Sequence, residues 1–123
     1  MNTTETKQML FDKMWRGLES QGWKRSMGGA GCVYRGEEGR KCAVGHCIPD
    51  DVYDPMMEGY GVDDVADKFD EVVDALPFFR NTHILDFLYD AQDAHDNAPI
   101  DMKERFRELA AEHGLTIPGE VAK

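Results

Sequence analysis

The chain has 123 residues, of which 41% are hydrophobic and 31% are charged, and its net charge is -10. This length suits one domain, and the share of apolar residues predicts a packed core and excludes a disordered chain. No apolar run approaches the roughly 18 residues of a membrane span, and the polar residues 1–5 lack the pattern of a secretory signal. We therefore expect a single-domain cytoplasmic protein.

The negative charge is concentrated in one part of the chain. Residues 50–101 hold fifteen Asp and Glu against two Lys and Arg, whereas residues 1–49 hold five acidic against eight basic residues. A negative block of this size repels phosphate groups, so it disfavours direct binding of nucleic acid or membranes and attracts basic proteins. A solvated acidic surface that keeps the protein soluble is the plain alternative. The split of charge also allows head-to-tail homo-oligomers.

Residues 3–21 predict an amphipathic helix, because apolar side chains recur every three or four positions along them. Asn2 and Glu5 stand at the spacing of a capping box at its start. Gly17 costs a helix roughly 1 kcal/mol relative to Ala. A glycine at this position indicates that a neighbour packs closely against the helix.

Residues 32–45 predict a β-hairpin, which follows a glycine-rich loop over residues 24–31. Two apolar runs, 32–35 and 40–44, flank a Gly-Glu-Glu-Gly turn at residues 36–39. Short apolar runs joined by such a turn are typical of antiparallel strands. An isolated hairpin is marginal in water, so helices are expected to cover one of its faces.

Three further helices are predicted from apolar periodicity over residues 62–76, 82–96 and 102–113. Asn81 is a favourable N-cap for the second of these helices. Residues 116–123 are expected to form a loose tail. The predicted fold class is therefore α+β, with about four helices packed around one β-hairpin in a single small domain.

Five separated pieces of the chain carry a resemblance. Residues 34–53 contain the pattern YRG…KCAVGxxIPDxxY, residues 21–22 read Gln-Gly, residues 57–59 read Met-Glu-Gly, residues 95–96 read His-Asp and residues 113–115 read His-Gly-Leu. In their order along the chain, and over most of its length, these pieces resemble a group of small uncharacterised phage and prophage proteins. The resemblance implies no established activity. It implies an accessory protein that binds and modulates or inhibits a host protein, in host defence or nucleic-acid machinery, in the bacterial cytoplasm.

The cysteines suggest reduced thiols or metal ligands, because three is an odd number for a disulfide framework. Cys42 and Cys47 have a spacing that zinc sites use. Cys32, across the predicted hairpin, would be a third ligand, and His46, His83, His95 or His113 would be the fourth. The plain alternative is that the cysteines are small core residues. Zinc is thus the one cofactor that the sequence suggests, and none is otherwise expected.

Two catalytic arrangements have weak support. Cys42 follows Arg40 and Lys41, whose charges lower a thiol pKa, and any of the histidines would supply a base. His95 and Asp96 form a His-Asp pair, but the further ligands of a helical phosphohydrolase are missing. His95 also lies on the apolar face of its predicted helix, which favours a histidine at the edge of the core. We therefore predict no catalytic residue, and a binding protein rather than an enzyme.

A basic segment provides an alternative function. Arginine binds phosphate through two hydrogen bonds, and glycine amides line many anion sites. A small nucleotide-like or phosphate-like ligand would bind here if the basic side chains converge. The plain alternative is solvated charge, or pairing with the protein's own acidic face. The residues concerned are Lys24, Arg25, Arg35, Arg40 and Lys41.

The leading hypothesis is a non-enzymatic protein that engages a host protein through the acidic residues 50–101. Charge would govern association rate and partner choice, and aromatic anchors would supply affinity. The alternatives are the small-ligand binder above and a small Cys- or zinc-dependent enzyme. The candidate partner-binding residues are Asp50, Asp51, Asp54, Asp63, Asp64, Asp67, Tyr53, Tyr60, Phe78 and Phe79.

Overall fold

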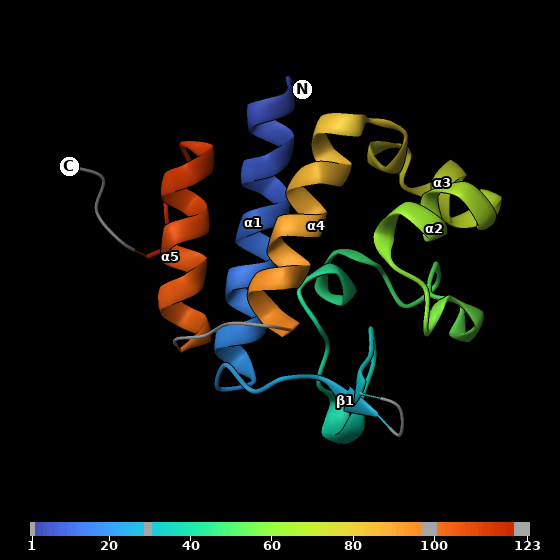
Figure 1. The fold of residues 1–123 in the computed structure, drawn as a ribbon, viewed down its shortest axis with the longest axis horizontal. Coiled ribbons are helices and arrows are strands. Elements are labelled where there is room, and N and C mark those ends of the chain that lie inside the picture. Colours follow the sequence, from blue (N-terminus) through green and yellow to red (C-terminus); the bar gives the residue numbers. More distant parts are fainter. Residues whose placement is uncertain (1, 29–30, 97–100, 120–123) are drawn as a thin grey trace.

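The computed structural model describes residues 2–28, 31–96 and 101–119. Three long helices, α5, α1 and α4, lie side by side, and two short helices, α2 and α3, lie beyond α4 (Figure 1). Short 3-10 turns lie between α1 and α2 and between α3 and α4, and one of these turns, η2, packs against both α1 and α4. The α-helices are α1 Thr3–Ser20, α2 Val62–Lys68, α3 Asp70–Ala75, α4 Thr82–Asp96 and α5 Met102–His113; the 3-10 turns are η1 Glu37–Gly39, η2 Val44–Cys47, η3 Pro55–Met57 and η4 Pro77–Arg80.

The described part of the chain is helical, so the predicted α+β fold with a hairpin over residues 32–45 is wrong. Extended pairing is limited there to two residues on each side, β1 Met27–Gly28 with β2 Gly31–Cys32, and to one bridge between Arg35 and Lys41. The chain does reverse at η1, where Glu38 and Gly39 have positive φ angles. It does not continue as a second strand.

The second predicted strand leads into η2, and the chain is buried over residues 42–45. Ala43 has α-helical dihedral angles, and Cys42, Val44 and Cys47 are all at most 2% exposed. A strand with one solvated face would alternate buried and exposed residues. A continuous buried run instead suits a turn wedged between helices, and η2 fills the space between α1 and α4.

Helix α1 forms the centre of the core. Its capping box is present, with the Asn2 side chain accepting from the Glu5 amide at 2.8 Å. Its apolar face, which includes Trp15, is fully buried against α4, α5 and η2. A Cβ atom at Gly17 would overlap the His46 ring. The close neighbour predicted at this glycine is therefore confirmed, and it is η2.

The predicted helix over residues 62–76 is divided into α2 and α3. The break falls at Phe69, whose ψ angle of 74° is not helical. Its ring packs edge-on against Tyr60, with ring centroids 5.7 Å apart. No glycine or proline stands at this break, so the sequence carries no signal for it.

Helices α4 and α5 lie over the residues that their periodicity indicates. Asn81 accepts hydrogen bonds from the amides of His83 and Ile84 at the start of α4. Gly114, with φ of 68°, ends α5, and the Leu115 amide donates to the Ala110 carbonyl at 2.8 Å, as in a Schellman motif.

The segment that follows α5 was predicted as a loose tail, and its described part contacts α1. Thr116 exchanges two hydrogen bonds with the Gln8 side chain, each of 2.9 Å. Ile117 packs against the core. Across the described ranges, no helix has the length and apolar character that crossing a membrane requires.

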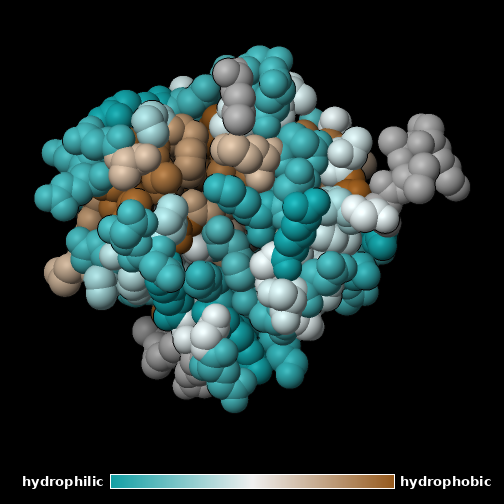
Figure 2. Space-filling model, turned by 180° about the vertical axis from the view of Figure 1, so that it is seen from behind, coloured by the Kyte–Doolittle hydropathy of each residue, from teal (hydrophilic) through white to brown (hydrophobic). Residues whose placement is uncertain are grey.

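Apolar surface is unevenly distributed. Seen from behind, it gathers on the side of the molecule that carries α2, α3 and η4, and most of the remaining face is hydrophilic (Figure 2). Partly buried side chains of this region include Phe69, Leu76 and Phe78.

Candidate functional site

A groove runs between α4 and the loop that precedes α2, and we call it the α4 groove. It consists of two adjoining cavities of about 340 and 260 Å³, which share Gly61, Gln92 and Asp96. The larger cavity is near the lower end of the roughly 300–1,000 Å³ found for small-ligand sites. The larger cavity is lined by Val33, Tyr34, Cys42, Glu58, Gly59, Tyr60, Gly61, Gln92 and Asp96, and the smaller by Gly61, Val62, Tyr89, Gln92, Asp93 and Asp96.

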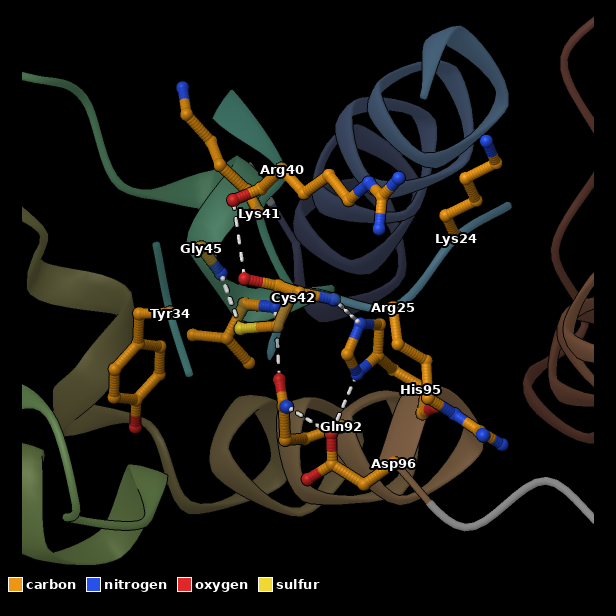
Figure 3. A network of polar contacts seen from close by, with 12 residues as sticks. Lys24, Arg25, Tyr34, Arg40, Lys41, Cys42, Gly45, Gln92, His95 and Asp96 are labelled. Atoms are coloured by element: carbon orange, nitrogen blue, oxygen red, sulfur yellow. Dashed lines mark hydrogen bonds and ion pairs between the residues drawn. The ribbon is translucent and has the colours of Figure 1, made fainter. Parts of the chain in front are cut away.

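Asp96 is the carboxylate on which the groove is centred, and its orientation is fixed by two neighbours on α4. The His95 Nδ1 atom lies 2.6 Å from Asp96 Oδ1, and Gln92 Nε2 donates to the same oxygen at 2.9 Å. The other ring nitrogen of His95 accepts from the Ser26 amide at 3.2 Å. Because Nε2 is an acceptor, Nδ1 carries the proton and donates it to Asp96 (Figure 3).

His95 is thereby a positioning group with no access to a ligand. Its side chain is 0% exposed, whereas that of Asp96 is 29% exposed. Both hydrogen bonds to Asp96 end on Oδ1, and Figure 3 shows the second oxygen directed away from His95. No described residue makes a hydrogen bond to the Oδ2 atom.

Glu58 is the second carboxylate of the groove, and it has a structural task. It accepts from the amides of Tyr34 and Arg35 at 2.8 and 3.1 Å, and from the Tyr53 hydroxyl at 2.6 Å. The Tyr34 hydroxyl donates to the Tyr60 carbonyl at 2.6 Å. These contacts fix the wall of the groove that faces α4.

The groove carries a negative potential. Its ionisable carboxylates are Glu58, Asp93 and Asp96, and no Lys or Arg is among its described lining residues. The pKa of the Tyr34 phenol is raised, mainly by burial and further by the negative charges of Glu58, Asp96 and nearby Asp64. A group that enters this groove is thus favoured if it is cationic.

Cys42 lies at the base of the groove, but its environment disfavours a nucleophile. Burial raises the pKa of this thiol, although its sulfur accepts from the Gly45 amide at 3.3 Å. The thiol is therefore protonated at neutral pH, and the thiolate that attacks substrates is absent.

The residues predicted to bind zinc do not converge. The Cys47 sulfur lies 3.7 Å from the Leu10 carbonyl in the core, and burial raises its pKa to about 12. His46 Nε2 lies 3.0 Å from the Gln21 side-chain oxygen. The side chain of Cys32 lies outside the described residues. Among those that are described, no three His, Cys, Asp or Glu side chains are placed to hold a metal ion.

The basic side chains of the predicted anion site are engaged separately. Arg35 and Lys41 contact the Asp50 carboxylate at 2.7 and 3.7 Å. Arg35 also donates to the Ile48 carbonyl and stacks over the Tyr53 ring, with its guanidinium carbon 4.4 Å from the ring centre. These contacts correspond to pairing with the protein's own acidic residues.

The other three basic residues point to different surroundings (Figure 3). Arg40 pairs with Glu38 at 2.8 Å, and Arg25 donates to the His95 carbonyl at the end of α4. Lys24 is exposed. The structure therefore does not bring the five basic side chains to one anion site.

The residues predicted to bind a partner occupy several surfaces. Asp50 and Asp51 are exposed near η2, Asp54 caps η3, and Asp63, Asp64 and Asp67 are exposed on α2. Among the aromatic candidates, Tyr53 and Phe78 are half-buried, and Tyr60 is 40% exposed at the groove. Phe79 is 1% exposed within the core, so its prediction as an anchor is wrong.

Tyr89 is a groove residue that the sequence reasoning missed. Its side chain is 62% exposed at the edge of the smaller cavity. It stands on α4 away from the apolar face of that helix, and a large aromatic residue on a polar face was the available signal. Met56, at 72% exposure in η3, is a second exposed apolar side chain.

Comparison with known proteins identifies no relative: no protein-family model, no curated protein and no solved structure matches this chain.

Proposed function

We propose that this protein binds a basic host protein, and that the α4 groove and the acidic surface of α2 beside it form the interface. The observation that carries the proposal is the composition of the groove. The groove contains three carboxylates and the exposed rings of Tyr60 and Tyr89, and none of its described lining residues is Lys or Arg.

Each part of this surface has a role in association. Exposed carboxylates on α2, which include Asp63 and Asp67, accelerate encounter with a basic partner by long-range attraction. Exposed tyrosines supply apolar contact area at a small entropic cost, as interface anchors do. The proposal sets this binding in the cytoplasm of a bacterial host cell, and the resemblance to phage-encoded accessory proteins supports that setting.

The experiment is capture of partners from bacterial lysate by immobilised protein, with quantitative mass spectrometry of the bound fraction. A groove variant carries Tyr89→Ser with Asp93→Asn. A matched control carries Glu19→Gln with Met56→Ser, changes at exposed side chains that lie outside the groove lining. Unfolding curves of both variants confirm that the comparison is made between folded proteins.

The proposal predicts that the original chain and the control enrich the same basic protein. The groove variant is expected to recover about tenfold less of it, equivalent to a loss of about 1.4 kcal/mol of binding free energy. Equal recovery by the groove variant would contradict the placement of the interface. Failure of the original chain to enrich any basic protein would contradict the function.

A further inference from the structure

The α4 groove contains a carboxylate, that of Asp96, whose orientation is fixed by its neighbours. Oδ1 is occupied by His95 and Gln92, while Oδ2 has no hydrogen-bond partner among the described residues. The buried His95 ring fixes the direction of the carboxylate, so a ligand that binds Oδ2 does not have to order it. The walls add the phenol rings of Tyr34 and Tyr60. Aromatic faces attract cations, and carboxylates bind them through charge-assisted hydrogen bonds.

A metal ion is a poor occupant of this site. Calcium takes about six to eight oxygen ligands, and magnesium requires a nearly ideal octahedron. Glu58 already accepts three hydrogen bonds, and Oδ1 of Asp96 accepts two. A carboxylate oxygen with no hydrogen-bond partner among the described residues suits a single ammonium or guanidinium hydrogen bond instead.

The opening of the groove indicates the kind of molecule that carries this charge. The smaller cavity continues from Asp96 along α4 to Tyr89, which is 62% exposed. A cationic side chain that reaches Asp96 would therefore leave its main chain along this outer part, beside Asp93 and the Tyr89 ring. An extended peptide has this shape, and a free inorganic cation does not.

We propose that the α4 groove binds a basic peptide segment of the partner protein, with one lysine or arginine side chain inserted to contact Asp96 Oδ2. This inference rests on the proposed function and deepens it, because it names the chemical group of the partner that is recognised. In this arrangement Asp96 is the binding residue, and His95 and Gln92 are positioning residues.

The test is a nuclear magnetic resonance titration of ¹⁵N-labelled protein with a synthetic peptide in which two lysines are separated by glycines. An arginine version and a glutamine version of the same peptide are titrated in parallel. The variant Asp96→Asn keeps an oxygen that accepts from His95 and removes the charge. The variant Glu19→Gln removes one exposed charge from α1, outside the groove lining and the acidic surface of α2, and is the matched control.

The lysine or arginine peptide is expected to shift the amide signals of Gly59, Gly61, Gln92 and Asp96, and the glutamine peptide is not. Asp96→Asn is expected to weaken peptide binding about tenfold, equivalent to about 1.4 kcal/mol, and Glu19→Gln less than about twofold. The amide spectrum of each variant shows whether it is folded. Tyr89→Ser, at the exposed edge of the groove, provides a second variant and is also expected to weaken binding.

Three results would overturn the inference: equal binding by the Asp96→Asn and original proteins, shifts confined to the exposed acids of α2, or equal response to the glutamine peptide. None of these would affect the lysate experiment. A captured partner together with an unresponsive groove would therefore reject this inference alone, whereas the absence of any captured basic protein would reject the proposed function.

Discussion

At the scale of single residues, Gly17 shows most clearly how one position connects two elements. It lies within α1, where alanine has the higher intrinsic helix propensity, and the His46 ring of η2 occupies the space that a Cβ atom would need. His46 in turn contacts Gln21, which accepts from the Lys41 amide and donates to the carbonyls of Lys24 and Lys41. Because Gly17 has no side chain, the His46 ring packs closely against α1. Gln21, at the end of this helix, then bonds the loop segments that contain Lys24 and Lys41.

Gly17→Ala is expected to destabilise the protein by about 1–3 kcal/mol, because overpacking outweighs the gain of about 1 kcal/mol in helix propensity. Chemical denaturation measures the difference. In a His46→Ala background the obstacle is absent, and the same substitution should become neutral or stabilising. A loss of equal size in both backgrounds would show that His46 is not the cause.

His46 also predicts a dependence of stability on pH. Burial, and then the positive charge of Lys41, lower its pKa from the ordinary 6.5 to about 4. The unfolded chain therefore binds a proton at a pH where the folded protein does not. The contribution of His46 is complete above about pH 6.5 and is lost as the pH falls toward 4.

Melting temperatures measured between pH 7 and pH 4 test this prediction. The original protein is expected to lose more stability over this interval than His46→Gln, which cannot titrate at this position. Both proteins carry the same remaining carboxylates and histidines, so the difference between them isolates His46. Parallel losses in the two proteins would contradict the lowered pKa.

At the scale of elements, the sequence predicts the long helices well and the short apolar segments poorly. Helices α1, α4 and α5 have a sustained apolar stripe, and their ends carry caps such as Asn2, Asn81 and Gly114. The segment that contains Cys42 and Cys47 is too short for periodicity to separate a strand from a buried turn. Its conformation depends on α1 and α4, which enclose it, so the local sequence does not predict it.

Asn81 provides a prediction for α4, the helix that carries Gln92 and Asp96. Its side-chain oxygen accepts from the amides of His83 and Ile84 at 2.9 and 3.2 Å. Asn81→Ala should cost about 1 kcal/mol of stability in chemical denaturation, since both amides lose their partner. Asn81→Asp keeps the acceptor and should stay within a few tenths of a kcal/mol. Equal losses of stability in the two variants would show that the acceptor oxygen of this side chain is not the cause.

At the scale of the whole molecule, the acidic character of the proposed binding surface follows from the sequence and the groove does not. The excess of carboxylates in residues 50–101 is visible in composition alone. The groove, however, joins Tyr34, Cys42, Glu58 and Asp96, which meet only after α4 packs beside η2 and the loop before α2. Long-range packing of this kind leaves no local pattern. The His95-Asp96 pair is the one local sign in the sequence, and in the structure the His95 ring orients the Asp96 carboxylate.

The acidic surface predicts that binding of the partner depends strongly on salt. Raising the ionic strength from about 0.1 M to about 1 M shortens the Debye length from about 10 Å to about 3 Å. Association should slow on the order of tenfold, because long-range attraction to the carboxylates is screened. Surface plasmon resonance measures the association and dissociation rates separately, and the dissociation rate should change less. An association rate that is independent of salt would contradict the role assigned to the acidic surface.

Hydrogen–deuterium exchange of the protein, with and without the captured basic partner, tests the central claim most directly. The account predicts slower exchange in the partner's presence at residues 58–61 and 89–96, which form the two sides of the α4 groove, and little change along α5. Protection confined to α5 or to the exposed side of α1, with unchanged exchange at both sides of the groove, would contradict it.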